Sequence, residues 1–165
     1  MGKIARVFIF ISLLLMTSFF SEASALEIGD KAPEFSLPNV DGEMISLSDF
    51  KGNVIILDFF ATWCPHCRKE LPGFIELHEA YGDKGLAVIG IASVSAEEAK
   101  DCVDEFDINF PVLIDDNESV SDLYGPVDSI PTTFLVDKKG KIVKIYEGFT
   151  GKDDFENDLK ELLEQ

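Results

Sequence analysis

Two cysteines separated by two residues, Cys64 and Cys67 in ATWCPHCRKELP (61–72), are the residues of this sequence best suited to chemistry. Their spacing fits half of a metal site, a structural disulfide, or a pair that exchanges electrons. A zinc site needs further ligands, and the remaining cysteine and two histidines supply no second pair at metal-ligand spacing. A disulfide that closes so short a loop removes little entropy from the unfolded chain. Redox exchange is therefore favoured, and no metal or other cofactor is expected.

The position of the pair in the chain predicts a different role for each sulfur. Residues 53–60 are nearly all apolar, as in a strand buried on both faces, and residues 64–81 have the period of a helix. Cys64 would then begin the helix, where unpaired amides and the helix dipole stabilise a thiolate. Pro65 suits the first turn because it lacks an N–H that would be unpaired there. Cys67 shares the apolar stripe, so we expect Cys64 to attack and Cys67, the more buried sulfur, to resolve.

The rest of the pattern predicts a single α/β domain. The expected elements are a hairpin over 35–47, a strand over 86–92, a helix begun by the capping box at Ser95 and Glu98, an extended piece at 111–114, a helix over 118–124, a strand hairpin over 132–137 and 141–148, and a last helix capped by Thr150. This order indicates a sandwich with a mixed central sheet and an added N-terminal hairpin. His78 is interpreted as a core or boundary histidine with satisfied hydrogen bonds, and Cys102 as a buried apolar cysteine.

The first 25 residues are predicted to lie outside that domain. Lys3 and Arg6 precede an apolar run over 7–20, and Ala-Ser-Ala at 23–25 fits a signal-peptidase site. The run is shorter than the roughly twenty residues that a membrane-spanning helix needs. We expect a signal peptide over 1–25, with an uncleaved anchor as the alternative, and one domain over 26–165. The domain would then lie in the periplasm or at the outer face of the membrane, where disulfides persist.

The charge of the chain argues against a nucleic-acid partner. Fourteen Lys and Arg side chains stand against thirty-one Asp and Glu, a net charge of −17. Phosphate binding needs clustered basic residues, whereas so acidic a surface mainly keeps a protein soluble. Protein thiols and disulfides are the expected partners, and the chain is expected to be a monomer.

Two distant segments resemble the thioredoxin superfamily. VIILDFFATWCPHCRKELP resembles its active-site segment, with Trp63 before the first cysteine, and SIPTTFLVDKKGKIV resembles its cis-proline strand, which implies Pro131 opposite CPHC. The N-terminal hairpin, FKGN, LAVIGIA and FPVLID are similar to the secreted TlpA/ResA branch, with its redoxin or AhpC/TSA-like domain. The resemblance covers nearly all of the chain after residue 25. It implies a thioredoxin-like three-layer sandwich and a thiol-disulfide oxidoreductase.

The resemblance also implies roles for residues around the pair. A cis Ile130–Pro131 bond would place a backbone edge beside the sulfurs, where Ile130 and Trp63 would contact an extended substrate. Asp58 matches the buried acid of thioredoxins, and Glu70 resembles the active-site glutamate of ResA. Burial should raise the pKa of Asp58. Both acids are candidate proton acceptors for the second cysteine, and a solvated surface acid is the alternative for Glu70.

The direction of electron flow is open between two interpretations. His66, as imidazolium between the sulfurs, would favour the dithiol and so make the disulfide oxidising, and Pro-His is also the dipeptide of DsbA. The stretch between LAVIGIA and Pro131 is too short for the helical insertion of DsbA, and TlpA/ResA-like proteins are usually kept reduced by a membrane electron donor. We expect a reductant of the cytochrome c maturation type, with cytochrome c precursors as clients. A disulfide oxidase is the alternative.

Two other classes of protein are alternatives. A non-catalytic copper carrier or thiol chaperone would use Cys64, Cys67 and His66. A thiol peroxidase would need PxxxTxxC, but Leu57 and Ala61 occupy the proline and threonine positions. Copper retention through dialysis would favour the first class, and rapid peroxide consumption would favour the second.

Overall fold

A mixed five-stranded sheet forms the centre of the molecule. The computed structural model describes residues 26–125 and 129–165, so the predicted signal segment at 1–25 lies outside the described residues. The strands are β3 (Val54–Phe60), β4 (Leu86–Ala92), β5 (Val112–Ile114), β6 (Thr132–Val136) and β7 (Ile142–Glu147), in the order β5-β4-β3-β6-β7. β3, β4 and β5 run parallel, whereas β6 is antiparallel to β3 and β7. The predicted mixed sheet is therefore confirmed.

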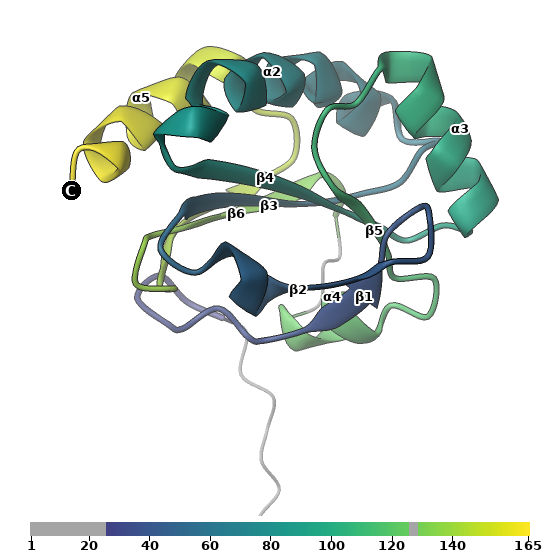
Figure 1. Cartoon of the computed structure of the whole chain (residues 1–165), viewed down its shortest axis with the longest axis horizontal. Coiled ribbons are helices and arrows are strands. Elements are labelled where there is room, and N and C mark those ends of the chain that lie inside the picture. Colours follow the sequence, from purple (N-terminus) through teal and green to yellow (C-terminus); the bar gives the residue numbers. More distant parts are fainter. Residues whose placement is uncertain (1–25, 126–128) are drawn as a thin grey trace, which may run out of the picture.

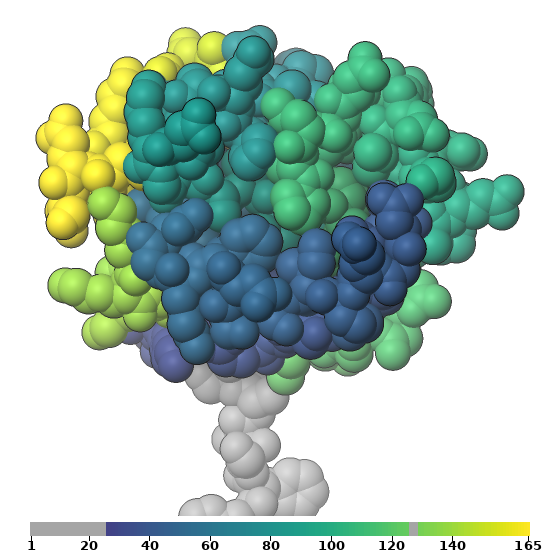
Figure 2. Space-filling view, viewed as in Figure 1, coloured from purple at the N-terminus to yellow at the C-terminus, as the bar shows by residue number. Residues whose placement is uncertain are grey.

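Two layers cover the sheet, one on each face (Figure 1). The helices α2 (Pro65–Tyr81), α3 (Ala96–Phe106) and α5 (Lys152–Leu163) lie on one side. The hairpin β1 (Ser36–Pro38) and β2 (Met44–Ser46), the short helix η1 (Leu47–Phe50) and α4 (Ser119–Leu123) lie on the other, and η2 (Gly82–Lys84) follows α2. In Figure 2 the blue surface of the hairpin and η1 crosses the lower half of the molecule. The three-layer sandwich with an added hairpin is thus confirmed.

The two apolar cores explain why the central strands carry almost no polar residues. One core packs between the sheet and α2, α3 and α5, and the other between the sheet and the hairpin side. Every residue of β3 and β4 is buried, because both faces of these strands are covered. Asp58 is the charged exception in β3, and this makes its position worth explaining.

Two details of the predicted helices are wrong. The N-cap of α5 is Gly151, not Thr150; Thr150 lies one residue before the cap, and its backbone N–H donates to Glu70 at 2.5 Å. His78 does not have satisfied hydrogen bonds: its Nδ1 is buried and has no partner within the described ranges. The buried face of α2 includes Glu70 and Leu77, which the period of the sequence did not identify.

Adjacent strands bring the distant motifs to one end of the sheet. β3 ends at Phe60 and leads into α2, and β6 begins at Thr132, directly after the proline of the second motif. β3 and β6 pair antiparallel, with Phe59 opposite Thr132, so the end of one strand meets the start of the other. The CPHC motif and Ile130–Pro131 therefore lie side by side. Within the part of the chain that the structure describes, no helix is long and apolar enough to span a membrane.

Candidate active site

The two sulfurs of the CPHC motif occupy different positions at the start of α2. Cys64 is the N-cap, and its Sγ accepts a hydrogen bond from the backbone N–H of Cys67 at 3.3 Å. Pro65 occupies the first turn, as predicted. Cys64 is 4% exposed and Cys67 1%, in agreement with the prediction that Cys67 is the more buried sulfur. Both are free thiols. A negative charge on Cys64 would face the unpaired amides of the helix.

The second motif lies against the first sulfur. The Ile130–Pro131 peptide bond is cis, as the resemblance implied, so a trans bond is excluded. The Cys64 thiol lies 3.6 Å from the carbonyl oxygen of Ile130, to which it donates. The carbonyl of Pro131 accepts from the N–H of Gly148 at 2.8 Å, which holds this segment to the loop after β7. Trp63, 71% exposed, lies at the surface beside the pair.

Asp58 is buried in the middle of β3 with a single hydrogen-bond partner in the described chain. It is 1% exposed, and its Oδ1 accepts from the hydroxyl of Thr133, the opposite residue on β6, at 3.1 Å. Burial raises the pKa of Asp58 well above its ordinary value, the charge of Glu70 raises it further, and the hydrogen bond from Thr133 lowers it. Asp58 therefore keeps its proton to a higher pH than an ordinary aspartate does.

Glu70, one turn after the second cysteine, is buried and is not a solvated surface acid. It is 3% exposed; its Oε1 accepts from Thr150, and its Oε2 is buried without a partner among residues 26–125 and 129–165. Burial raises the pKa of Glu70 to about 7, and the Thr150 hydrogen bond only partly opposes this rise. The carboxyl can therefore gain or lose a proton near neutral pH.

The thiol of Cys67 is linked electrostatically to these acids. Burial raises the pKa of Cys67, the hydrogen bond with Cys64 and the charge of Asp58 raise it further, and a backbone hydrogen bond from Ala61 lowers it. Asp58 thus acts on Cys67, while Glu70 acts on Asp58. The two predicted acids and the second sulfur form one group of buried sites whose protons are interdependent.

Phe149, which the sequence analysis did not identify, lies beside the motif. It is 38% exposed, its ring centroid is 6.5 Å from that of His66, and the ammonium of Lys69 lies 4.0 Å from its ring centroid. A cavity of about 270 Å³ between this loop and α2 is lined by Lys69, Glu70 and Phe149, among others. The sequence does show an aromatic residue two positions after the last strand, which could have indicated a contact surface, but no motif includes this residue.

Two further expectations concern Cys102 and metal binding. Cys102 is 3% exposed and burial raises the pKa of its thiol, as expected for a small apolar residue within α3. No group of three His, Cys, Asp or Glu side chains that could hold a metal ion occurs in the described parts of the chain.

Comparison with known proteins defines the class of protein. Thiol-disulfide oxidoreductase ResA of Bacillus cereus is 36% identical over 92% of this chain and 88% of its own length. Thioredoxin-like protein YneN of Bacillus subtilis is 38% identical over 88% of this chain and 86% of its own length. With the thioredoxin-like fold and the CPHC pair, this similarity makes the chain a thiol-disulfide oxidoreductase.

Family and structural matches agree with that class. The AhpC/TSA family matches residues 28–145, and the chain belongs to this family. A thiol:disulfide interchange protein of the thioredoxin family from Chlorobium tepidum has 32% identity and a TM-score of 0.74, with 84% of this chain and 99% of that chain covered. A candidate DsbE of the same organism has 33% identity and a TM-score of 0.79, with 84% and 99% covered.

Proposed function

We propose that this protein reduces disulfides of extracytoplasmic proteins through Cys64 and Cys67. The Cys64 thiolate attacks one sulfur of a client disulfide, and the other client sulfur leaves as a thiolate that takes up a proton. Cys67 then attacks Sγ of Cys64, which forms the Cys64–Cys67 disulfide and releases the reduced client. Two electrons pass to the client, and a membrane electron donor restores the dithiol. The protein needs no further cofactor in this cycle.

The observation that carries the assignment of roles is the position of the Cys64 sulfur. It lies at the helix N-terminus, 3.3 Å from the N–H of Cys67 and 3.6 Å from the carbonyl of Ile130. A thiolate there gains from the helix dipole and that amide. A client strand that pairs with the backbone at Ile130 would bring its own disulfide to the same sulfur. Trp63 would contribute an exposed surface to the contact.

The buried acids provide a route for the proton of Cys67. The second step needs a Cys67 thiolate, although burial raises the pKa of this thiol. Asp58 acts electrostatically on Cys67, so we assign it as the immediate proton acceptor. We assign Glu70 a secondary role, in which its charge modulates the pKa of Asp58. The pKa of Glu70, about 7, allows both of its protonation states at neutral pH.

The proposed direction and location depend on the relatives and on the N-terminal sequence. The matched proteins are named ResA and DsbE, which supports the TlpA/ResA branch, and we assign cytochrome c precursors as the client class on that resemblance. Residues 1–25 carry the signal pattern that would place the domain in the periplasm or at the outer face of the membrane. The chain acts as a monomer in this scheme.

The reduction potential of the Cys64–Cys67 pair tests the direction. Equilibration with a thiol–disulfide buffer, followed by quantification of the free thiols, should give a value near that of thioredoxin, about −270 mV. A value near that of DsbA, about −120 mV, would contradict the reductant role and support the oxidase. His66→Ala should make the pair more reducing, because an imidazole between the sulfurs is expected to favour the dithiol. His78→Ala is the matched control.

A further inference from the structure

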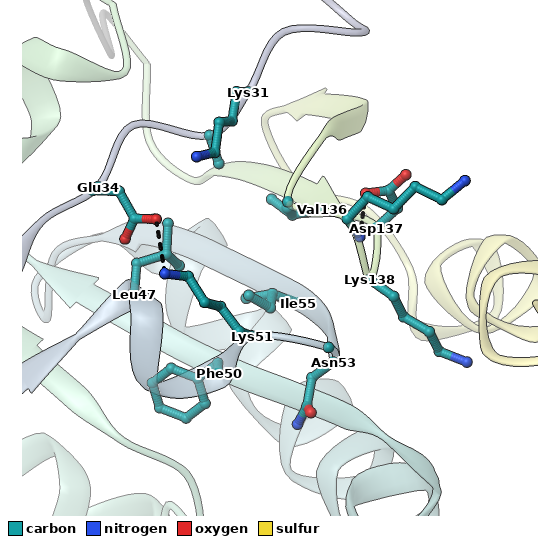
Figure 3. Close-up of a pocket in the computed structure, with 14 residues that line it drawn as sticks. Lys31, Glu34, Leu47, Phe50, Lys51, Asn53, Ile55, Val136, Asp137 and Lys138 are labelled. Carbon is teal, nitrogen blue, oxygen red and sulfur yellow. Dashed lines mark hydrogen bonds and ion pairs between the residues drawn. The ribbon is translucent and has the colours of Figure 1, made fainter.

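Figure 3 shows a second cavity, lined by residues such as Ile55 and Val136. These two residues pair near the start of β3 and the end of β6, which is the end of the sheet opposite the CPHC motif. The cavity has a volume of about 310 Å³ and lies between η1, the first residues of β3, the segment around Lys31, and the turn after β6. The strand β3 has seven residues. Ile55, which lines this cavity, is its second residue, and Cys64 lies four residues beyond its last one. A strand rises about 3.3 Å per residue, so the two sites are roughly 20 Å apart. The cavity is therefore separate from the active site.

The base of the cavity is apolar. Ala32, Leu47, Ile55 and Val136 line it, and each is less than 9% exposed, so their side chains belong to the core on the hairpin side of the sheet. Phe50 adds an aromatic wall. These groups can contact a hydrocarbon chain or ring but offer no hydrogen-bonding groups to a polar ligand.

The rim is basic in an otherwise acidic protein. After residue 25 the sequence holds twelve Lys and Arg against thirty Asp and Glu. Four of those twelve line the cavity, namely Lys31, Lys51, Lys138 and Lys139, whereas only two of the thirty acids do, Glu34 and Asp137. The sign of the local charge is thus opposite to that of the whole chain, which attracts an anion to this place.

Lys138 donates to the carbonyl oxygen of Leu163 at 2.9 Å, so the positive charge available at the rim comes from the other three lysines. Asp137 is committed to the turn, where its Oδ1 accepts backbone N–H groups at 2.8 and 2.9 Å. Lys51 meets Glu34 at 3.9 Å, a long contact between exposed groups that Figure 3 shows beside Leu47 and Ile55. Lys31 and Lys139 have no carboxylate within 4 Å in the described ranges.

From this combination we infer that the cavity binds an amphipathic anion, with a carboxylate or phosphate head at Lys31 and Lys51 and a short hydrocarbon portion over the apolar base. Exposed ion pairs alone contribute little to affinity, so a purely ionic ligand would bind weakly without the apolar contact. The volume is at the lower end of the range for small-molecule sites, roughly 300–1,000 Å³, which suits a short chain or ring. The head group could belong to a soluble molecule or to a lipid of an anionic membrane.

A titration with octanoate tests the site. The protein is used as it is purified from the cells that express the full chain. Backbone amide NMR signals of residues 51–53 and 139–140 should shift saturably, and octyltrimethylammonium, which has the same tail and the opposite charge, should not shift them. The double variant Lys31→Glu/Lys51→Glu should bind octanoate about tenfold more weakly, because two favourable charges become unfavourable. The control is Lys100→Glu/Lys160→Glu, which reverses the charge of two lysines outside the cavity. It should bind octanoate with the affinity of the unchanged protein.

Three results would overturn the inference: no saturable shift with octanoate, equal shifts with the cationic analogue, or unchanged affinity in Lys31→Glu/Lys51→Glu. Sedimentation with phosphatidylglycerol vesicles, compared with phosphatidylcholine vesicles, separates the two sources. If the protein sediments with anionic vesicles, and both octanoate and the double variant abolish this, the head group belongs to a lipid. If octanoate binds but the protein does not sediment, the head group belongs to a soluble molecule. Exchange of Cys64 with a small disulfide should be unchanged in every variant, so this test stands apart from the proposed reductase activity.

Discussion

Two aspartates of this protein are equally deeply buried but differ in the hydrogen bonds they accept. Asp115, 0% exposed, follows β5 and accepts from Ser119, Val120 and Ser121 at the start of α4. Asp58, 1% exposed, accepts from Thr133 alone among the described residues. The first carboxylate satisfies the free donors of a helix start. The second is left short of donors beside a reactive thiol.

The difference between Asp115 and Asp58 shows which buried carboxyl stabilises the fold and which serves the reaction. Burial of a carboxylate costs free energy unless hydrogen bonds replace those of water. The donors around Asp115 offset that cost. Asp58 accepts a single hydrogen bond and Glu70 has one buried oxygen without a partner among the described residues, and both acids keep their protons to a higher pH than ordinary carboxyls do. Raised pKa values in a group of buried acids are typical of functional sites. The end of β3 is therefore the reactive region, and the start of α4 is a structural one.

Removal of the structural carboxylate should have the largest effect. Asp115→Ala leaves the buried backbone donors of Val120 and Ser121 unpaired and removes the acceptor of the Ser119 hydroxyl, so the free energy of unfolding should fall by about 3 kcal/mol. Urea unfolding measures this, and Asp116→Ala, at an exposed neighbouring position, should change it by less than about 0.5 kcal/mol. A loss below about 1 kcal/mol for Asp115→Ala would remove the contrast between the two regions.

Glu70 should make stability fall as pH rises. Its pKa is raised from 4.5 to about 7, so between these values the folded state holds a proton that the unfolded state has lost. Stability should therefore decrease by about 2 to 3 kcal/mol from pH 4.5 to pH 7 on account of Glu70, and this share should level off above pH 7.

The variant Glu70→Gln isolates this contribution. Urea unfolding of this variant at a series of pH values should show a fall that is smaller by the same 2 to 3 kcal/mol. Glu79→Gln, at an exposed position of the same helix, is the control. An unchanged pH profile in Glu70→Gln would show that this acid titrates as an ordinary surface group.

Asp58→Asn should affect the reaction instead of the fold. Loss of the proton acceptor should slow the attack of Cys67 on the mixed disulfide about 100-fold at neutral pH. The free energy of unfolding should not fall, because a poorly satisfied buried acid is removed, which is the opposite of Asp115→Ala. Stopped-flow release of a thiol from a Cys64 mixed disulfide measures the step. A larger loss in Glu70→Gln than in Asp58→Asn would reverse the assignment of the two acids.

Phe149→Ala should have the smallest effect, at the edge of the reactive region. The ring is 38% exposed beside His66, so contact with a client should change most. We expect the KM for a protein disulfide to rise about threefold, a loss typical of one peripheral contact, with the rate on a small disulfide unchanged. Leu123→Ala, 52% exposed on α4, is the control. Equal effects on protein and small disulfides would exclude a contact role for Phe149.

Much of the reactive region could be predicted because its signals are local. A buried apolar strand followed by CPHC fixes the position of both sulfurs, and Asp58 is conspicuous as the charged residue of that strand. The pairing of β3 with β6 then follows from the resemblance, and it places Pro131 at the same end. These features depend on spacing within short segments and on the order of the segments.

The remaining features depend on contacts between distant segments. Glu70 is buried because Thr150, eighty residues away in sequence, folds back onto α2 and donates to it, and no period of the helix predicts this contact. The N-cap position predicted for Thr150 is occupied by Gly151, the next residue. The position of Phe149 beside the CPHC motif depends on the same loop. The structural role of Asp115 depends on α4, whose backbone N–H groups at Val120 and Ser121 donate to the carboxylate. The basic cavity likewise joins three separate segments of the chain, 31–34, 47–55 and 136–140.

Trapping with Cys67→Ser in the native compartment tests the central claim most directly. Without the resolving sulfur, Cys64 should remain in mixed disulfides with its clients, which non-reducing electrophoresis and mass spectrometry can detect. The double variant Cys64→Ser/Cys67→Ser should trap none. We predict that Cys67→Ser accumulates client adducts linked through Cys64. Adducts no more abundant than in the double variant would contradict the proposed role of Cys64 as the attacking thiol.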